Sequence, residues 1–580
     1  MLYNVLTRVC WLVAFALTFY GSLDSLGRGS GSWKRGAGPS SFSGQRRTDL
    51  RYRLAHVDKN GRRIKNLGRF FSNLRTYRRH SERQLLGASS KSDEATFEDL
   101  RKWMQEQGCY MSHGLYTQAD ANGLRGLYTH ENLKGNDCIL KAPANLTLSP
   151  SGLRKEQEIV QLVLEENSNS STRQVADLHL MLIKLAAEKR KKKGSKWYSY
   201  LQTLPSLWDF RDHPLMKTQS PAMQLLAGTN FAKKLDQCLT DVVLTRDRYN
   251  EKIRLRLQDL LWAYLVLTTR SFSKSGSDFS IDPEPLLVPL ADFVNHDTGH
   301  ANAEWRFDTT EQTFRVVVKP EKEIPCGGQI LFNYGQPPKS DLLMLLGYGF
   351  VPCGGGKGEV RGDTEGGDVA FDTGFVSIGP EIIEISANYS DPNTQRMFAL
   401  QRAQVLAESV KVPSSMGGRT VTMRFGQTEP LSVENELRTL ESMLVVAEQQ
   451  LRAISEAEKV TTQACQDDYF FLKIREGEVC VFRWIEEVGK RYVPLLKLLD
   501  EYNSLEERLR KNDEDCLSSD DEATPMDVKS SYSVLQNEMN HLKRDLKAKI
   551  AVLRSQASAE NDAYLEGVIL PLIANASIVS

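Results

Sequence analysis

The chain has 580 residues, of which 41% are hydrophobic and 26% are charged. This length exceeds what one hydrophobic core organises, so it predicts two or more folded domains joined by linkers. Lys plus Arg and Asp plus Glu both number 74, and a formal net charge of zero gives no indication of bulk affinity for nucleic acid. The nine cysteines are scattered and include no Cys-x-x-Cys pair. This spacing argues against a clustered zinc site and favours reduced, mostly structural thiols.

The N-terminal 24 residues contain an apolar stretch at positions 9–23. Its 15 residues are typical of a signal-peptide core and fall short of the roughly 20 that a spanning helix needs. No other stretch is long and apolar enough to span a bilayer, so we expect no stable membrane span in the mature protein.

A basic segment follows at residues 25–92. Positions 25–90 carry 16 Lys and Arg but only three acidic residues, and they are rich in Ser and Gly. This composition predicts a disordered, transit-like segment. A signal-like core followed by such a segment resembles the bipartite presequence of plastids surrounded by extra membranes, so we expect a plastid location. A signal anchor in the endomembrane system and a cytoplasmic or nuclear protein with a misassigned start are the alternatives.

Ordered sequence is expected from about Ala95, where apolar residues are first spaced as on one face of a helix. Short apolar runs separated by turn residues indicate strands, and longer apolar-periodic stretches indicate helices. In chain order, the pattern predicts strands at 123–149, helices at 155–270, strands at 285–332, a Gly-rich linker at 353–374 and helices at 434–456, 469–499 and 533–556.

Three pieces of sequence carry the strongest signal through their order and spacing. Residues 289–297 read P-L-A-D-F-V-N-H-D, residues 332–335 read F-N-Y-G, and residues 341–350 read D-L-L-M-L-L-G-Y-G-F. Together they resemble the C-terminal half of a SET domain, in the subgroup of Rubisco large-subunit methyltransferase and its histone-directed and actin-directed relatives. G-L-R-G-L-Y at 123–128 resembles the loop that opens such a domain. Further landmarks of the subgroup are found at 134–143, 195–205, 261–264 and 269–272.

This resemblance covers about residues 95–575 and implies an α+β fold. A knotted, β-rich SET domain is expected at 95–352, with a large helical insert at about 151–280. An all-α substrate-binding domain is expected at 375–576. Threaded topologies are rare, and this family is one of the exceptions.

The activity implied by the resemblance is transfer of a methyl group from S-adenosyl-L-methionine (AdoMet) to a lysine of a protein substrate, without a metal. Such a site must align donor and amine at about 3 Å. It must also present a neutral amine, which a dry channel favours because desolvation disfavours the ammonium form. We expect a monomer and no nucleic-acid partner.

Residue roles follow from the same resemblance. Tyr334 is the expected catalytic residue, whose phenol helps to align the methyl group and the target nitrogen. Tyr348 and Phe350 are expected to form walls of the lysine channel, and Asp292 to lie near the substrate entry. The residues expected to bind AdoMet are Arg125, Gly126, Leu127, Arg270, Asn295 and His296. Each residue type also has a purely structural alternative, such as core packing for the aromatic rings and helix or turn capping for the polar groups.

Two other functions stay open at this stage. A protein-histidine methyltransferase would carry the same motifs. A SET-derived binding scaffold without catalysis is the second alternative, because the opening loop reads L-R-G where many relatives have G-x-G. The basic run at 189–193 has the composition of a nuclear signal or nucleic-acid patch, but its place between two insert helices favours a solvated loop.

Overall fold

The computed structural model describes residues 91–575 apart from 120–123, 155–160, 162, 164–172, 219, 275–283, 335–339, 353–358, 361–370, 372, 380, 410–428, 461–468, 519–525 and 557–562. The signal-like and transit-like predictions, and most of the predicted Gly-rich linker, lie outside the described residues. Within these described ranges, no helix is long and apolar enough to cross a membrane, and no group of three or more His, Cys, Asp or Glu side chains could hold a metal ion.

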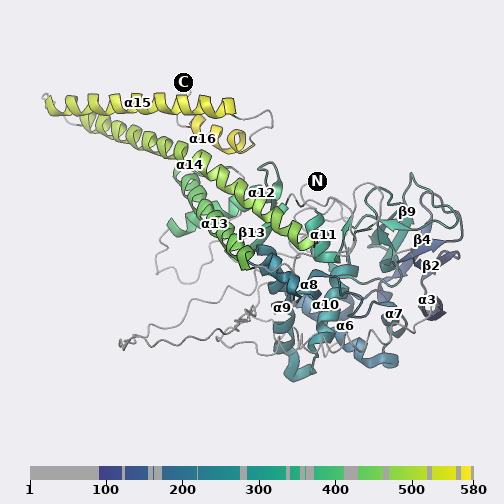
Figure 1. Ribbon diagram of the computed structural model, residues 1–580. Coiled ribbons are helices and arrows are strands. Elements are labelled where there is room, and N and C mark those ends of the chain that lie inside the picture. The colour runs from purple at the N-terminus through teal and green to yellow at the C-terminus, as the bar shows by residue number, and fades with distance from the viewer. Residues whose placement is uncertain are drawn as a thin grey trace, which may run out of the picture.

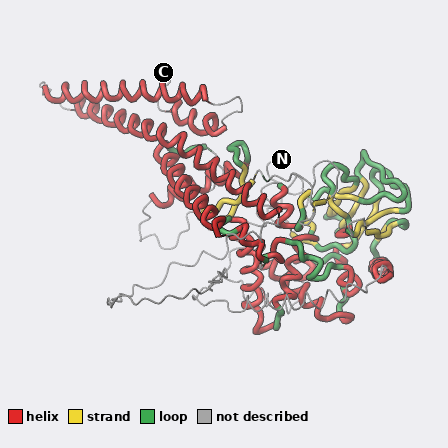
Figure 2. The backbone as a smooth tube through the Cα atoms, in the orientation of Figure 1, coloured by secondary structure: helices red, strands yellow, loops and turns green. Residues whose placement is uncertain are grey.

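Most of the strands gather at one end of the molecule, whereas β13 lies near its middle (Figures 1 and 2). A four-stranded antiparallel sheet has the order β1-β4-β9-β8, β7 pairs in parallel with β10, and β2-β3, β5-β6, β11-β12 and β13-β14 form antiparallel pairs. The strands are β1 Tyr110–Met111, β2 Leu115–Ala119, β3 Arg125–Thr129, β4 Cys138–Pro143, β5 Phe272–Lys274, β6 Glu284–Leu286, β7 Asn295–His296, β8 Ala303–Asp308, β9 Thr313–Val318, β10 Leu331–Phe332, β11 Val351–Pro352, β12 Glu359–Val360, β13 Thr373–Ile378 and β14 Glu381–Ser386.

Most of the helices occupy the middle of the molecule and its far end, whereas α3 lies beside β2 (Figure 1). They are α3 Lys91–Glu106, α4 Pro150–Leu153, α6 Arg173–Lys191, α7 Tyr198–Thr203, α8 Pro214–Lys217, α9 Asn230–Ile253, α10 Leu257–Arg270, α11 Asp341–Tyr348, α12 Pro392–Ser409, α13 Val433–Val460, α14 Tyr469–Ser518, α15 Met526–Gln556 and α16 Leu570–Asn575. Single turns of 3-10 helix include η4 Ala291–Phe293.

Helix α10 is central because it is apolar on nearly every side. Ten of its residues are buried, and it packs against both α6 and α9. A helix that is apolar all round belongs in a core. Its last residue is Arg270, whose guanidinium reaches the turn η4 between the helices and the strands.

The C-terminal part is built from long helices. Helices α13 and α14 pack side by side, and the outer half of α14 pairs with α15 in a helical hairpin that projects away from the body (Figure 1). The expected α+β class is confirmed. The C-terminal region is mainly helical, as predicted, but it begins with the hairpin β13-β14, which the sequence analysis placed in helical sequence.

Two hydrophobic cores hold these parts together. The first core spans the strands and the helical insert, and the second unites β13-β14 with the C-terminal helices. Glu478 of α14 joins them, since its carboxylate accepts hydrogen bonds from the backbone N–H groups of Asn230 (2.8 Å) and Phe231 (2.6 Å) at the start of α9. The first N–H groups of a helix lack intrahelical partners, and the Glu478 side-chain oxygens satisfy two of them.

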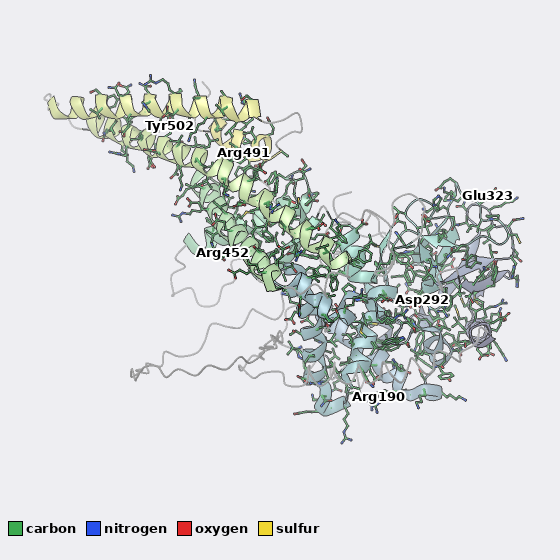
Figure 3. All side chains as sticks on the ribbon, viewed as in Figure 1. Arg190, Asp292, Glu323, Arg452, Arg491 and Tyr502 are labelled. Carbon is green, nitrogen blue, oxygen red and sulfur yellow. The ribbon has the colours of Figure 1, made fainter. Side chains whose placement is uncertain are left out.

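The basic run at 189–193 is not a simple solvated loop. Its first three residues end α6, and Lys189 Nζ lies 3.7 Å above the ring centre of Trp262. The guanidinium of Arg190, at the lower edge of the body in Figure 3, donates a 2.8 Å hydrogen bond to the carbonyl of Arg254. Helix C-termini favour cations, which explains part of this cluster without a partner.

Candidate active site

A short segment at residues 290–296 organises the site. Buried Leu290 has a positive φ of 71°, which is strained for a bulky side chain. The turn η4 follows and then β7, which pairs in parallel with β10 so that Asn295 opposes Leu331 and His296 opposes Phe332. This pairing brings the N-H motif beside the F-N-Y-G motif.

Four rings cluster where β7, β10 and α11 end. We call His296, Tyr334, Tyr348 and Phe350 the aromatic group. The Tyr334 ring centre lies 5.1 Å from that of His296, 5.0 Å from that of Tyr348 and 6.4 Å from that of Phe350. Phe350 also lies 6.0 Å from His296 and 6.1 Å from Tyr348. Ring faces attract cations, so this arrangement suits an alkylammonium group.

Two hydrogen bonds fix the orientation of Tyr334. Its backbone N–H donates to His296 Nδ1 (2.9 Å), and its hydroxyl donates to the Val294 carbonyl (2.7 Å). The phenol proton is thus committed, so toward a second partner the oxygen acts as an acceptor. Because His296 Nδ1 accepts, the neutral ring carries its proton on Nε2, which lies 3.0 Å from Thr298 Oγ1.

Helix α11 delivers the other two rings. It begins at Ser340, whose hydroxyl accepts from the Leu343 N–H (3.1 Å), and it ends at Gly349 in the left-handed conformation (φ 82°). Gly is the residue that adopts this conformation without steric cost. Tyr348 is the last helical residue and Phe350 follows the turn, so both side chains depend on the geometry at Gly349.

Polar side chains form a second cluster beside the turn η4. The Arg270 Nη1 donates to the Asp292 carbonyl oxygen (2.8 Å) and lies 3.5 Å from Asp292 Oδ2. Tyr200 of α7 donates its hydroxyl to the same Oδ2 (3.1 Å). Burial raises the pKa of Asp292, although the nearby guanidinium of Arg270 opposes this. Figure 3 shows Asp292 inside the body, between strands and helices.

This polar cluster is incompletely paired. Arg270 Nε and Asp292 Oδ1 are both buried, and neither has a hydrogen-bond partner among the described residues. Buried polar atoms in native proteins are nearly always satisfied, so each exception needs an explanation such as a ligand or an ordered water.

The strand β3 lies close to Asn295. The Asn295 Nδ2 donates to the Arg125 carbonyl (3.3 Å), and a Cβ on Gly126 would collide with the Gln329 amide and lie 3.0 Å from Asn295 Nδ2. Leu127 belongs to the first core, and its carbonyl accepts from the Ile330 N–H (2.8 Å). Gly126 thus leaves room for the side-chain amides of Gln329 and Asn295 beside the β3 backbone.

The Arg125 side chain points away from this surface. Its Nη2 donates to the Thr203 carbonyl at the end of α7 (2.7 Å), and its guanidinium lies 4.0 Å above the ring centre of Phe293. The Arg125 side chain therefore connects β3 to the end of α7 and to Phe293. Only its backbone carbonyl contacts Asn295.

All ten residues singled out from the sequence fall into three adjoining sets. The aromatic group holds four, Arg270 and Asp292 form the polar cluster, and Arg125, Gly126, Leu127 and Asn295 meet at β3. Two contributors were missed. Tyr200 lies in the landmark at 195–205, but nothing in the sequence indicates that it bonds Asp292. Gln329, which lies beside Gly126, belongs to a turn-rich stretch without a motif.

Comparison of the sequence with protein-family models gives a match. The family model described as SET domain matches residues 124–335. The chain therefore contains a SET domain, as expected from its motifs.

The chain is 24% identical over 267 residues to SET domain-containing protein 4 of Artemia parthenogenetica, covering 45% of this chain and 63% of that protein. It is 21% identical over 277 residues to the chloroplastic fructose-bisphosphate aldolase-lysine N-methyltransferase of Arabidopsis thaliana, covering 46% and 54%. The chain thus spans less than two thirds of either relative. Among solved structures, the SET domain of LSMT bound to lysine and AdoHcy is similar with a TM-score of 0.48 and 18% identity, covering 70% of this chain and 93% of that one.

Proposed function

We propose that this protein is an AdoMet-dependent protein-lysine N-methyltransferase. The observation that carries the proposal is the packing of three rings against that of Tyr334, whose hydroxyl proton is already committed to the Val294 carbonyl. A site of this kind receives a lysine side chain, because aromatic faces hold its aliphatic stem and a phenol oxygen accepts a hydrogen bond from its nitrogen.

The residues beside the aromatic group fit AdoMet. Gly126 lies in β3 next to the Asn295 amide, and its lack of a side chain keeps this part of the backbone unobstructed. Arg270 provides a guanidinium with a buried, unpartnered Nε, which suits a carboxylate. When bound, AdoMet supplies a methyl group on a positively charged sulfur; the amine lone pair forms the new N–C bond, the sulfur keeps the electron pair of the broken S–C bond, and the amine loses its proton to water.

The chain's own contribution is orientation and exclusion of water. Tyr334 accepts an N–H of the amine and so directs the nitrogen lone pair. The aromatic group excludes water from the amine, and this desolvation opposes the attraction of the ring faces for a cation and favours the neutral, nucleophilic form. His296 holds the Tyr334 backbone through Nδ1, so the phenol is positioned before the substrate enters.

The substrate in this proposal is a protein, bound with the help of residues 375–576, and the enzyme acts as a monomer without nucleic acid. The projecting hairpin α14-α15 offers the long exposed surface that a folded substrate needs. A plastid location completes the proposal. It is supported by the signal-like and transit-like composition of residues 1–92 and by the chloroplastic name of the Arabidopsis relative.

The test uses the full chain, methyl-labelled AdoMet and protein extract from organelles of the source organism, followed by amino-acid analysis of the labelled protein. We expect label in N-methyl-lysine and its loss with Tyr334→Phe. Label in methyl-histidine would replace lysine by histidine as the target. Binding of AdoMet without any transfer would favour the scaffold and overturn the proposal.

A further inference from the structure

A buried histidine lies beneath the turn that carries two rings of the aromatic group. His213 precedes α8, and its Nδ1 accepts a hydrogen bond from the Leu215 N–H (3.2 Å). The residue is only 3% exposed. Because Nδ1 is an acceptor, the neutral ring carries its proton on Nε2.

The ring is packed directly against Gly349. A Cβ on Gly349 would lie 3.0 Å from His213 Cδ2, and Gly349 has a φ of 82°. A side chain here would therefore meet both backbone strain and the imidazole. The lack of a side chain at Gly349 is what lets the His213 ring pack against this turn.

The same ring faces the end of α11. The last carbonyls of a helix lack intrahelical donors, and the Gly349 N–H satisfies only that of Leu345 (2.9 Å). The carbonyls of Leu346 and Gly347 lie near enough to the His213 ring to favour its protonated form. Burial outweighs them and lowers the pKa of His213 to about 4, so the ring is neutral near pH 7. Its Nε2 has no hydrogen-bond partner by distance and angle among the described residues. The N–H on this atom is nevertheless a donor that faces the Leu346 and Gly347 carbonyls at the end of α11.

The residues on either side of Gly349 are Tyr348 and Phe350, whose rings lie 5.0 Å and 6.4 Å from that of Tyr334. We propose that His213 is a positioning residue of the methyl-transfer site: by supporting the turn at Gly349 it sets how closely Tyr348 and Phe350 approach Tyr334, and thereby how many methyl groups the bound nitrogen can carry. This inference rests on the proposed function, and His213 itself touches none of the four rings in the contacts described.

Two isosteric variants separate the two nitrogen atoms of the ring. In His213→Asn the amide oxygen can replace Nδ1 as the acceptor for the Leu215 N–H, but nothing reaches α11. In His213→Gln the amide nitrogen can replace Nε2 as the donor toward α11, while the acceptor for Leu215 is lost. The control is His179→Asn, which removes an equally buried histidine of α6 whose Nδ1 lies 3.1 Å from the Tyr249 hydroxyl.

The readouts are kcat, the Kd for AdoMet and the ratio of mono- to higher-methylated product by mass spectrometry. For His213→Asn we expect kcat to fall about tenfold, because small displacements of a positioned group cost one to two orders of magnitude. We expect the product ratio to change and the Kd for AdoMet to stay within about twofold, since β3 and Asn295 are untouched. His213→Gln should keep the wild-type product ratio, and His179→Asn should change neither kcat nor the ratio.

A second pair of variants changes the glycine side of the contact between His213 and Gly349. This pair tests the proposal if His213→Asn does not fold. Gly349→Ala adds a methyl group against the His213 ring at positive φ. Gly108→Ala adds one at an equal φ of 80° where nothing lies within 4 Å, so it controls for backbone strain alone. We expect the product ratio to change only in Gly349→Ala.

The outcomes are distinct. A wild-type chain that transfers no methyl group to any protein overturns the proposed function and this role with it. An active wild type whose His213→Asn variant keeps the wild-type kcat and product ratio overturns the role of His213 alone, and reduces this residue to the cap of α8. Equal changes in His213→Asn and His213→Gln would also contradict it, because a general packing defect would then explain both.

Discussion

Two buried arginine–carboxylate pairs show how differently the two cores of this molecule are built. In the second core, Arg402 donates Nε to Glu436 Oε2 (2.5 Å) and Nη2 to Oε1 (2.9 Å). Tyr564 donates its hydroxyl to the same carboxylate, and the Tyr389 hydroxyl accepts from Arg402 (3.2 Å). Both charged side chains are at most 2% exposed. This pair is bidentate and enclosed.

In the first core, the pair of Arg270 and Asp292 is open. Only Nη1 reaches the carboxylate, at 3.5 Å, and the Arg270 side chain is 24% exposed. Arg270 Nε and Asp292 Oδ1 are buried without partners among the described residues. The closed pair satisfies its charged groups, whereas the open pair keeps buried hydrogen-bonding atoms without partners, and the Asp292 side chain is fully buried. The predictions below test that difference.

The largest effect is expected where the closed pair is broken. Glu436→Gln leaves Arg402 as a buried charge without its counter-ion, which costs about 3–5 kcal/mol of folding free energy. Urea unfolding monitored by circular dichroism measures it. A loss below about 1 kcal/mol would show that water reaches the pair and that it is not enclosed.

Tyr334→Phe removes the hydroxyl that accepts the amine but keeps the ring. Methyl transfer should fall about 100-fold, as for loss of one oriented polar group at a reacting centre, while the free energy of unfolding falls by only about 1 kcal/mol because the Val294 carbonyl loses its donor. Tyr389→Phe, the matched loss of a phenol hydroxyl in the second core, should lower stability without changing the rate per folded molecule. Equal rates for Tyr334→Phe and wild type would remove Tyr334 from the mechanism.

Glu478, which joins the two cores, makes a pH-dependent contribution. Burial raises its pKa from 4.5 to about 8, against the backbone N–H groups of Asn230 and Phe231 and the nearby ammonium of Lys233. The folded state then binds the proton more tightly than the unfolded state, so this contribution to stability is full below pH 4.5 and is lost as the pH rises through about 8.

Glu478→Gln should abolish that loss. The free energy of unfolding, measured for both proteins at pH 5 and pH 8, should fall more steeply with pH in the wild type than in the variant. If the free energy of unfolding changed equally with pH in the wild type and in Glu478→Gln, Glu478 would be ionised at both pH values. Its negative charge would then be stabilised by the N–H groups at the start of α9.

The smallest effect is expected for Asp292→Asn, the counterpart of Glu436→Gln in the open pair. The amide can still accept from Tyr200 and Arg270, and the raised pKa of Asp292 shows that its charge is already costly to bury. We expect a stability change of about 1 kcal/mol. A loss as large as that of Glu436→Gln would erase the distinction between the two pairs.

The sequence singled out most residues of the candidate site because they lie in short contiguous motifs. Asn295, His296 and Tyr334 come together through one parallel strand pairing, and Tyr348 and Phe350 through one helix end. What it could not supply depends on tertiary packing between distant segments.

Tyr200 reaches Asp292 across 92 positions, and His213 lies under a turn 136 positions later in the chain. The hairpin β13-β14 was missed for a related reason. Its strands read T-G-F-V-S-I and E-I-I-E-I-S, and runs of six residues are too short for their periodicity to distinguish a strand from a helix.

AdoMet binding is tested most directly by calorimetric titration into the wild-type chain and into Arg270→Met. We expect one binding site in the wild type and an affinity lower by about tenfold to 100-fold in the variant, because a charge-assisted hydrogen bond contributes roughly 1.5–3 kcal/mol. Equal affinities would show that the open pair is not the carboxylate site. Absence of AdoMet binding to the folded wild type would contradict the central claim.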